Sequence, residues 1–299
     1  MIEHPTIETD VPLAPLTTYK VGGPAAFFAE PVDLLDLRDV LEAVGPDTQI
    51  VVLGRGSNVV ISDDGIDGLV VRLGHSFQAA AVSPDGSIVA GGGMPLPKLA
   101  RFAAQEGRGG LGFYVGIPGS VGGAVRMNAG GHGAQTADVL DHAVVLDART
   151  GEVVEMTPAD LALSYRHSGL TDTDIVVQAT YNTHPADKAA LDLELREITR
   201  WRKDNQPGGT LNAGSVFKNP PGDHAGAIID RVGLKGERFG AIAVSDVHAN
   251  FLVAASDATA GDIFRFVYRI KAIVRDETGI DLEPEIKFLG DFSSVVVAP

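Results

Sequence analysis

The 299-residue chain contains no cysteine, so disulfides, thiolate nucleophiles and iron–sulfur clusters are all excluded. No apolar run approaches the ~18 residues of a membrane span, and the N-terminal MIEHPTIETD lacks the basic-then-apolar order of a secretion signal. The net charge of −15 argues against a general nucleic-acid binder, although a local basic pocket for an anion stays possible. We therefore expect a cytoplasmic enzyme that binds neither nucleic acid nor membranes.

Common catalytic and nucleotide-binding signatures are also missing. Val59 stands where a dinucleotide fingerprint beginning at Gly54 needs glycine, and no Gly-Lys-Ser/Thr closes a P-loop. No Gly-x-Ser-x-Gly elbow occurs, and the eight histidines are scattered without metal-ligand spacing. Hydrolase and kinase functions are therefore disfavoured, and no metal site is expected.

Glycine, by contrast, is abundant: there are 36, and eleven of them lie in the 27 residues from 107 to 133. Free amide N–H groups in such a loop form concave sites that bind anions. Phe113, Tyr114, Val121 and Val125 interrupt the glycines and predict a loop pinned into a core. A chain of tight turns between strands is the alternative explanation.

A second glycine-lined loop, 54–58, lies in the same half of the chain. Two loops of this kind, 54–58 and 116–133, suit a cofactor that carries a pyrophosphate, such as a dinucleotide.

Hydrophobic periodicity predicts a mixed, α+β fold. The strands are expected at 25–30, 49–54, 59–62, 68–73, 79–83, 88–93, 142–147, 152–156, 175–181, around 249–254, and at 283–288. The helices are expected at 33–44, 97–105, 185–204, 225–232 and 259–277. Thr259 is predicted to be the N-cap of the last helix and Gly279 to close it, and Gln206-Pro207-Gly208-Gly209 is a candidate hinge.

Several motifs together resemble the UDP-N-acetylenolpyruvoylglucosamine reductase family, in its shorter, type II-like form, over nearly the whole chain. They are TTYKVGG at 17–23, LGRGSN at 53–58, GIPGSVGG at 116–123 with MNAG at 127–130, SYRHS at 164–168, AGSVFKNP at 213–220 and PEI at 284–286. The GIPGxxGG and AGSxFKNP blocks are the most specific. Only 46 residues separate Ser168 from Ser215, which leaves no room for the capping insertion of the longer form.

This resemblance implies a two-part FAD-binding region of the vanillyl-alcohol-oxidase/CO-dehydrogenase flavoprotein type, followed by a C-terminal α/β substrate-binding domain. The corresponding bounds are 1–74 and 75–205 for the two FAD-binding subdomains and 206–299 for the substrate domain. It implies reduction of the UDP-sugar by NADPH through non-covalent FAD, in peptidoglycan precursor synthesis for the cell wall, by a monomer. The implied cofactor-binding residues are Gly54, Arg55, Gly56, Ser57, Asn58, Gly116, Ile117, Pro118, Gly119, Ser120, Gly122, Gly123, Asn128 and Ala129.

The family's catalytic positions fall on Arg166, Ser215 and Glu285. A guanidinium can hold the substrate carboxylate bidentately and stabilise the negative charge that builds as hydride arrives. Ser215 would then protonate the carbanionic carbon, and Glu285 would orient or stabilise the enolic carboxylate. Taken singly, these could instead be a surface ion-pair partner, a turn cap and an exposed strand residue.

Substrate contacts are implied for Lys203, Asn219 and Tyr165, and Arg200 is a possible helper. Lys203 could equally lie on a solvated helix face, and Tyr19 could stack near the flavin or simply pack. Two other functions stay open. One is another flavin oxidase or dehydrogenase on the same scaffold that acts on an alcohol or a hydroxy acid, and the other is a nucleotide-sugar-binding regulator without catalysis.

Overall fold

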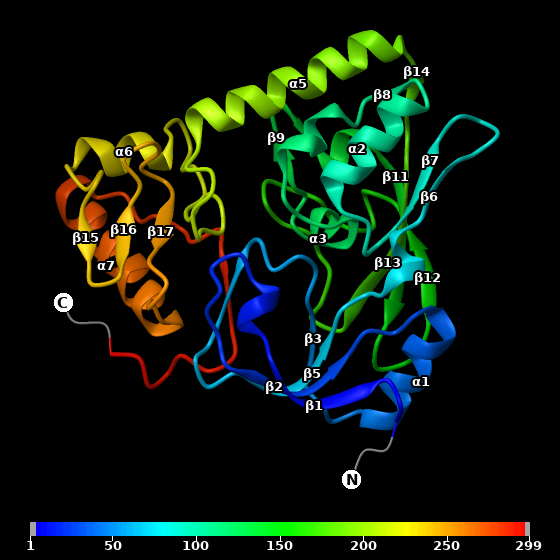
Figure 1. The fold of residues 1–299 in the computed structure, drawn as a ribbon, viewed down its shortest axis with the longest axis horizontal. Coiled ribbons are helices and arrows are strands. Elements are labelled where there is room, and N and C mark those ends of the chain that lie inside the picture. Colours follow the sequence, from blue (N-terminus) through cyan, green and yellow to red (C-terminus); the bar gives the residue numbers. More distant parts are fainter. Residues whose placement is uncertain (1–3, 297–299) are drawn as a thin grey trace. The chain divides into compact units, whose positions relative to one another are not determined.

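The computed structural model describes residues 4–296, and the chain divides into two units that each draw on several segments (Figure 1). Unit 1 comprises Met1–Thr9, Phe27–Arg55 and Gly68–Trp201, and unit 2 comprises Asp10–Ala26, Gly56–Asp67 and Arg202–Pro299. The three predicted domains are consecutive in sequence, at 1–74, 75–205 and 206–299, whereas these two units interleave. The division into two FAD-binding subdomains and a substrate domain therefore stays a prediction. Within residues 4–296, every helix is too short or too polar to traverse a lipid bilayer.

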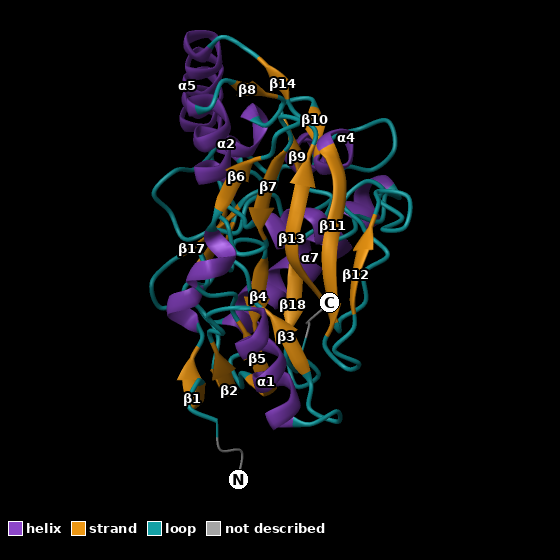
Figure 2. Cartoon of the chain, turned by 90° about the vertical axis from the view of Figure 1, so that its right-hand side faces the viewer, coloured by secondary structure: helices purple, strands orange, loops and turns teal. Residues whose placement is uncertain are grey.

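The largest sheet lies in unit 1 and has the strand order β12-β11-β13-β7-β6 (Figure 2). Its strands are β12 (Val153–Met156), β11 (Leu140–Asp147), β13 (Asp174–Tyr181), β7 (Ile88–Gly91) and β6 (Ala80–Val82). All neighbours pair antiparallel. The strands predicted at 79–83 and 88–93 correspond to β6 and β7, which form a hairpin with Gly86 at φ +87° in its turn.

A second sheet has the order β1-β2-β5-β3 and carries helix α1 (Leu34–Val44). Its strands are β1 (Ile7–Pro12), β2 (Pro24–Ala29), β5 (Ile66–Val71) and β3 (Ile50–Val52), and the division between the units falls inside the first three. The side chain of Asp33 caps α1 by accepting a hydrogen bond from the amide of Asp36. Leu37 and Val40 on the inner face of α1 are fully buried.

The remaining elements of unit 1 surround the glycine loop. They are the 3-10 turns η2 (His75–Gln78) and η3 (Gly112–Gly116), the helices α2 (Leu96–Gln105), α3 (Val121–Arg126), α4 (Thr136–Val139) and α5 (Lys188–Asn205), and the short strands β8 (Arg108–Gly109), β14 (His184–Pro185), β9 (Gly130–Gly131) and β10 (Ala134–Gln135).

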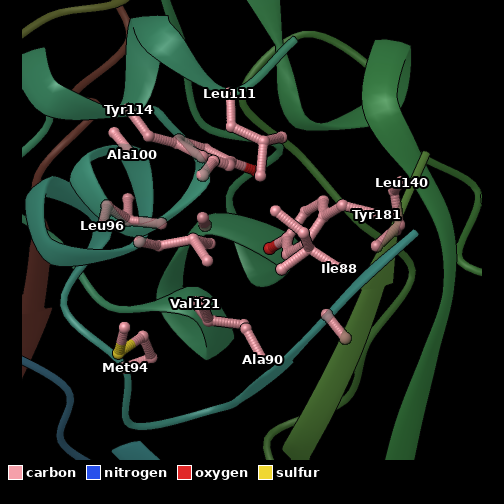
Figure 3. Packing of buried hydrophobic residues seen from close by; sticks show 14 of the residues in the cluster. Ile88, Ala90, Met94, Leu96, Ala100, Leu111, Tyr114, Val121, Leu140 and Tyr181 are labelled. Atoms are coloured by element: carbon pink, nitrogen blue, oxygen red, sulfur yellow. The ribbon is translucent and has the colours of Figure 1, made fainter. Parts of the chain in front are cut away.

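The glycine loop is built into a hydrophobic core. Phe113, Tyr114, Val121 and Val125 are buried, and they cluster with side chains of α2 and of the five-stranded sheet. Figure 3 shows Tyr114 and Val121 in this cluster. The prediction of a pinned loop is confirmed. Such a loop can hold its backbone in a fixed shape, as a binding site requires.

Unit 2 contains the meander β15 (Arg238–Phe239), β16 (Ile242–Val244) and β17 (Leu252–Ala254), and β4 (Val59–Ile61) pairs parallel with β18 (Lys287–Leu289). Helices α6 (Ala225–Arg231) and α7 (Ala260–Thr278) and the 3-10 turn η1 (Ala14–Leu16) complete it. The predicted ends of the long helix are confirmed. Thr259 and Asp262 form a capping box, and Gly279 closes the helix in the left-handed conformation.

The predicted strand at 283–288 is wrong in its first half, because β18 begins only at Lys287. Pro284 lacks an N–H, and the segment around it makes an isolated bridge with Phe217 instead. Sequence analysis also missed β15 and β16, which are too short to show a clear alternation.

Candidate functional site

A cavity in unit 1 brings parts of the two glycine loops together. It encloses about 660 Å³ of empty space, including solvent at its mouth, and Gly54 and Arg55 line it together with Ser120, Gly122 and Gly123. The other lining residues are Val52, Leu53, Arg72, Leu73, Gln78, Gly92, Gly93, Arg126, Leu170, Asp174 and Val176. The expectation that both loops serve one site in this half of the chain is therefore supported within unit 1.

The glycines of this cavity are required by close packing. A Cβ atom on Gly54 would lie 2.5 Å from Ser120 Oγ, and one on Gly92 would meet the Val176 carbonyl oxygen. Gly123 differs, because its Cβ would meet only Ser120 Oγ, at 3.4 Å, an ordinary contact distance. A larger side chain at Gly123 would therefore extend into the cavity.

Charge and free donors at the cavity fit an anionic ligand. Arg55, Arg72 and Arg126 line it, against one carboxylate, Asp174. The guanidinium of Arg72 lies 3.3 Å from Glu30, and that of Arg126 lies 2.7 Å from Asp172. The amides of Gly54 and Arg55 have no protein acceptor among residues 4–296. A pyrophosphate needs such a combination of cations and backbone donors, so the residues present fit the expected FAD.

Helix α3 forms part of the cavity wall, but the amides of its first residues are already hydrogen-bonded within the protein. The amide of Val121 donates to Met94 O and that of Gly122 to Gly92 O, at 2.9 and 2.7 Å, and Ser120 Oγ accepts from Gly123 N at 3.4 Å. The preceding turn is also tied down, because Ile117 N donates to Tyr114 O. Direct contacts of Gly116, Ile117, Pro118 and Gly119 with the cofactor stay predictions.

Replacement of Gly123 tests the cavity without disturbing its walls. We expect Gly123→Val to purify with well under half of the flavin of the wild type, because the new side chain fills space that the diphosphate needs. The unfolding temperature of the flavin-free protein should change little. The measurement is the ratio of absorbance near 450 nm to that at 280 nm. Gly208→Val is the control, since its Cβ would meet nothing within 4 Å. Full flavin occupancy in Gly123→Val would contradict this assignment.

Arg166 lies at the tip of a tight hairpin in unit 1. Ser164 and His167 exchange two backbone hydrogen bonds of 3.0 and 3.1 Å, which leaves Tyr165 and Arg166 as the turn. Arg166 has φ +54°, unusual for a residue other than glycine, and its guanidinium donates to Gly130 O at 2.8 Å. The guanidinium also lies 5.1 Å from the centre of the Tyr165 ring.

Ser215 and Glu285 belong to neighbouring segments of unit 2. The amide of Glu285 donates to Val216 O at 2.7 Å, and that of Lys218 donates to Glu283 O at 2.9 Å. The serine segment is also pinned by the buried Asn250, whose side chain exchanges two hydrogen bonds with the backbone of Phe217. Two segments from distant parts of the sequence, one carrying Ser215 and the other carrying Glu285, therefore pair through their backbones.

Loop 56–58 is hydrogen-bonded to the segment that carries Glu285 and to the start of β18. The side-chain amide of Asn58 donates to Glu285 O at 3.2 Å, and its carbonyl accepts from Lys287 N at 2.9 Å. Asn58 thus has a structural role in unit 2. A contact of Gly56, Ser57 or Asn58 with the cofactor stays a prediction.

The expected substrate residues occupy varied settings. Lys203 is exposed near the end of α5, as is Arg200, and Tyr165 is 48% exposed. Asn219 accepts a hydrogen bond from Ala225 N and so fixes the start of α6. Tyr19 is packed in the core of unit 2 with its hydroxyl donating to Leu252 O, and burial raises its pKa, so packing is the explanation that holds.

Sequence analysis missed Gly92, Gly93 and Arg72 at the cavity, whereas Arg126 lies within the expected loop 116–133. The run Gly91-Gly92-Gly93 was the available signal, because three glycines at the end of a strand allow a close approach of backbone. Among residues 4–296 no cluster of three or more histidine, aspartate or glutamate side chains is arranged to hold a metal ion.

Comparison with known proteins gives matches over most of the chain. A model described as the UDP-N-acetylenolpyruvoylglucosamine reductase C-terminal domain matches residues 206–289, and one described as an FAD binding domain matches residues 25–157. The reductase of that name from Caulobacter sp. (strain K31) is 42% identical over 94% of each chain, and that from Rubrobacter xylanophilus is 42% identical over 96% of each. The crystal structure of the reductase from Thermus caldophilus matches with a TM-score of 0.83 at 34% identity, over 95% of this chain and 99% of that chain.

Proposed function

Since the chain belongs to the UDP-N-acetylenolpyruvoylglucosamine reductase family of oxidoreductases and carries an FAD-binding domain, we propose that it reduces UDP-N-acetylenolpyruvoylglucosamine to UDP-N-acetylmuramate with NADPH. The observation that carries this proposal is the backbone pairing that sets the segment of Ser215 against that of Glu285. A proton donor beside a carboxyl group suits protonation of an enolate better than it suits oxidation of an alcohol.

Each residue has a distinct task in this proposal. FAD, when bound and reduced, supplies the hydride that adds to the methylene carbon of the enolpyruvyl group. Arg166 holds the substrate carboxylate and stabilises the negative charge that develops beside it. Ser215 gives its hydroxyl proton to the adjacent carbon and regains a proton from solvent, and Glu285 orients the enolic carboxylate.

The test is substrate-dependent oxidation of NADPH by the purified, flavin-loaded protein. We expect absorbance at 340 nm to fall when the enolpyruvyl sugar is added, with a product two mass units heavier than the substrate. Reduction of the flavin by an alcohol or a hydroxy acid, with no effect of the sugar on NADPH oxidation, would favour the rival flavin oxidase or dehydrogenase. Binding of the sugar without any turnover would favour the non-catalytic regulator.

Lys203 is proposed to contact the diphosphate of the sugar nucleotide, far from the bond that is reduced. A charge that stabilises the ground state and the transition state equally appears in KM rather than kcat. Lys203→Ala is therefore expected to raise KM for the UDP-sugar about tenfold and to leave kcat nearly unchanged. Lys188→Ala, at the other end of α5, is the matched control. An unchanged KM would place Lys203 on the solvated face of the helix.

Further parts of the proposal follow from the substrate. A nucleotide-sugar and NADPH are cytoplasmic compounds, so we propose a cytoplasmic protein that acts in peptidoglycan precursor synthesis as a monomer. Nucleic acid and membranes are not expected partners, which agrees with the net charge of −15.

A further inference from the structure

Asn128 is a buried residue whose side chain connects several backbone segments of unit 1. Only 1% of its surface is exposed, and its backbone has φ +40°. Its side-chain amide donates to Ser164 O at 2.9 Å and to Gln135 Oε1 at 3.1 Å, and its side-chain oxygen accepts from Ala137 N at 2.9 Å. Both amide hydrogens and the oxygen are thus used within the protein. The contacts with the cofactor that the family resemblance implies for Asn128 and Ala129 stay predictions.

These bonds connect Asn128 to the base of the Arg166 hairpin. Ser164 is the first residue of that hairpin, and on its far side Ser168 Oγ donates to Arg126 O at 2.7 Å. The tip is held as well, through the bond from Arg166 to Gly130 O. The segment 126–130 therefore fastens the hairpin at its entry, at its exit and at its tip.

Segment 126–130 is itself rigidly supported. Ala129 O accepts from both the amide and the hydroxyl of Thr136, and Ala129 N donates to Ala124 O. Tyr114, which is fully buried, donates its hydroxyl to Thr136 Oγ1 at 3.0 Å. The joint at Asn128 is thereby tied to the core of unit 1, in which Figure 3 shows Tyr114.

We propose that Asn128 is a positioning residue for Arg166: it fixes the entry of the 164–167 hairpin, and so fixes where the guanidinium lies. The contribution of Asn128 to the reaction rate rests on the proposed function of Arg166. The effect of Asn128 on the position of the hairpin is independent of that function. Placement within a fraction of an ångström matters here, since a shift of about 1 Å can cost about 10²-fold in rate.

Two substitutions distinguish the effect of Asn128 on the hairpin from an effect on the stability of the whole fold. Asn128→Asp keeps the shape and the acceptor for Ala137 N but loses donors, and Asn128→Gly removes the side chain where glycine tolerates the backbone. Asn182→Asp is the matched control, because that side chain donates to Asp141 Oδ1 away from the hairpin.

The first measurement is the single-turnover rate of substrate reduction per bound, pre-reduced flavin. We expect a loss of about 10–100-fold in both variants, and less than about twofold further loss when either is combined with Arg166→Ala. A global loss of stability would lower the amount of folded protein but not the rate per flavin. A rate within about twofold of the wild type, or a loss that adds fully to that of Arg166→Ala, overturns the proposal.

The second measurement needs no activity. Trypsin can cut after Arg166, and a loosened hairpin should be cut there about tenfold faster in Asn128→Gly than in the wild type, without faster cutting at Arg101 in helix α2. An equal rate of cleavage after Arg166 in Asn128→Gly and the wild type would contradict the proposed role of Asn128. A parallel rise in the cleavage rates at Arg166 and Arg101 would contradict it as well. If the wild type failed to reduce the enolpyruvyl sugar, the proposed function would fall while this measurement still decided the role of Asn128 in the hairpin.

Discussion

Ser215→Ala should block reduction of the enolpyruvyl sugar while FAD stays bound and NADPH still reduces it. General acid catalysis contributes about 10²–10⁴-fold, so kcat should fall by a factor of that size. The fold should tolerate the change, because backbone bonds and Asn250 hold the segment, with Val216 N donating to Asn250 O at 2.8 Å. The hydroxyl is needed only after NADPH has reduced the flavin, in the half-reaction in which the flavin is oxidised and the sugar is reduced.

Stopped-flow absorbance separates the two halves of this reaction. Bleaching of the flavin band by NADPH should proceed at the wild-type rate in Ser215→Ala, and its return on addition of the sugar should be slow. Ser215→Cys is the informative partner variant, because a thiol is also a proton donor and should restore part of the rate. If Ser215→Ala reduced the sugar at close to the wild-type rate, the proton would have to come from another group.

Local signals in the sequence were sufficient for most helices and hairpins. Thr259 and Gly279 bound α7 because capping depends on residues within one turn of each end. The Asp85-Gly86 hairpin is likewise a short-range structure. The last strand was misplaced because its start depends on Phe217, a partner far away in the sequence.

The site shows the same division between local and long-range information. The glycine motifs indicated both loops, since their spacing is a local property. The cavity also needs Gly92 and Arg72, which spacing could not assign, because they reach it only through the pairing of β7 with β13 and of β5 with β3. The hydrogen bonds of Asn128 could not be predicted either, because its partner Ser164 belongs to a different motif.

The interleaved units have a related cause. Residues 56–67 follow directly on Gly54 and Arg55, yet they belong to the unit of the C-terminal segment, because β4 pairs with β18 rather than with a neighbour in sequence. The local sequence around β4 gives no signal of this pairing, because its parallel partner lies at the far end of the chain.

Arg166→Ala is expected to lower kcat about 10²–10³-fold, the usual cost of removing one group that stabilises a developing anion. The guanidinium stabilises negative charge that develops only as the hydride arrives, so KM should change much less than kcat. This is the reverse of the result expected for Lys203→Ala. Arg166→Lys should fall between, because an ammonium keeps the charge but loses the planar pair of donors. The hairpin bond to Gly130 O is lost in Arg166→Ala. Steady-state kinetics with the UDP-sugar decide the matter, and Arg101→Ala on α2 is the control. A raised KM with unchanged kcat in Arg166→Ala would mean that this arginine binds the substrate without taking part in the chemical step.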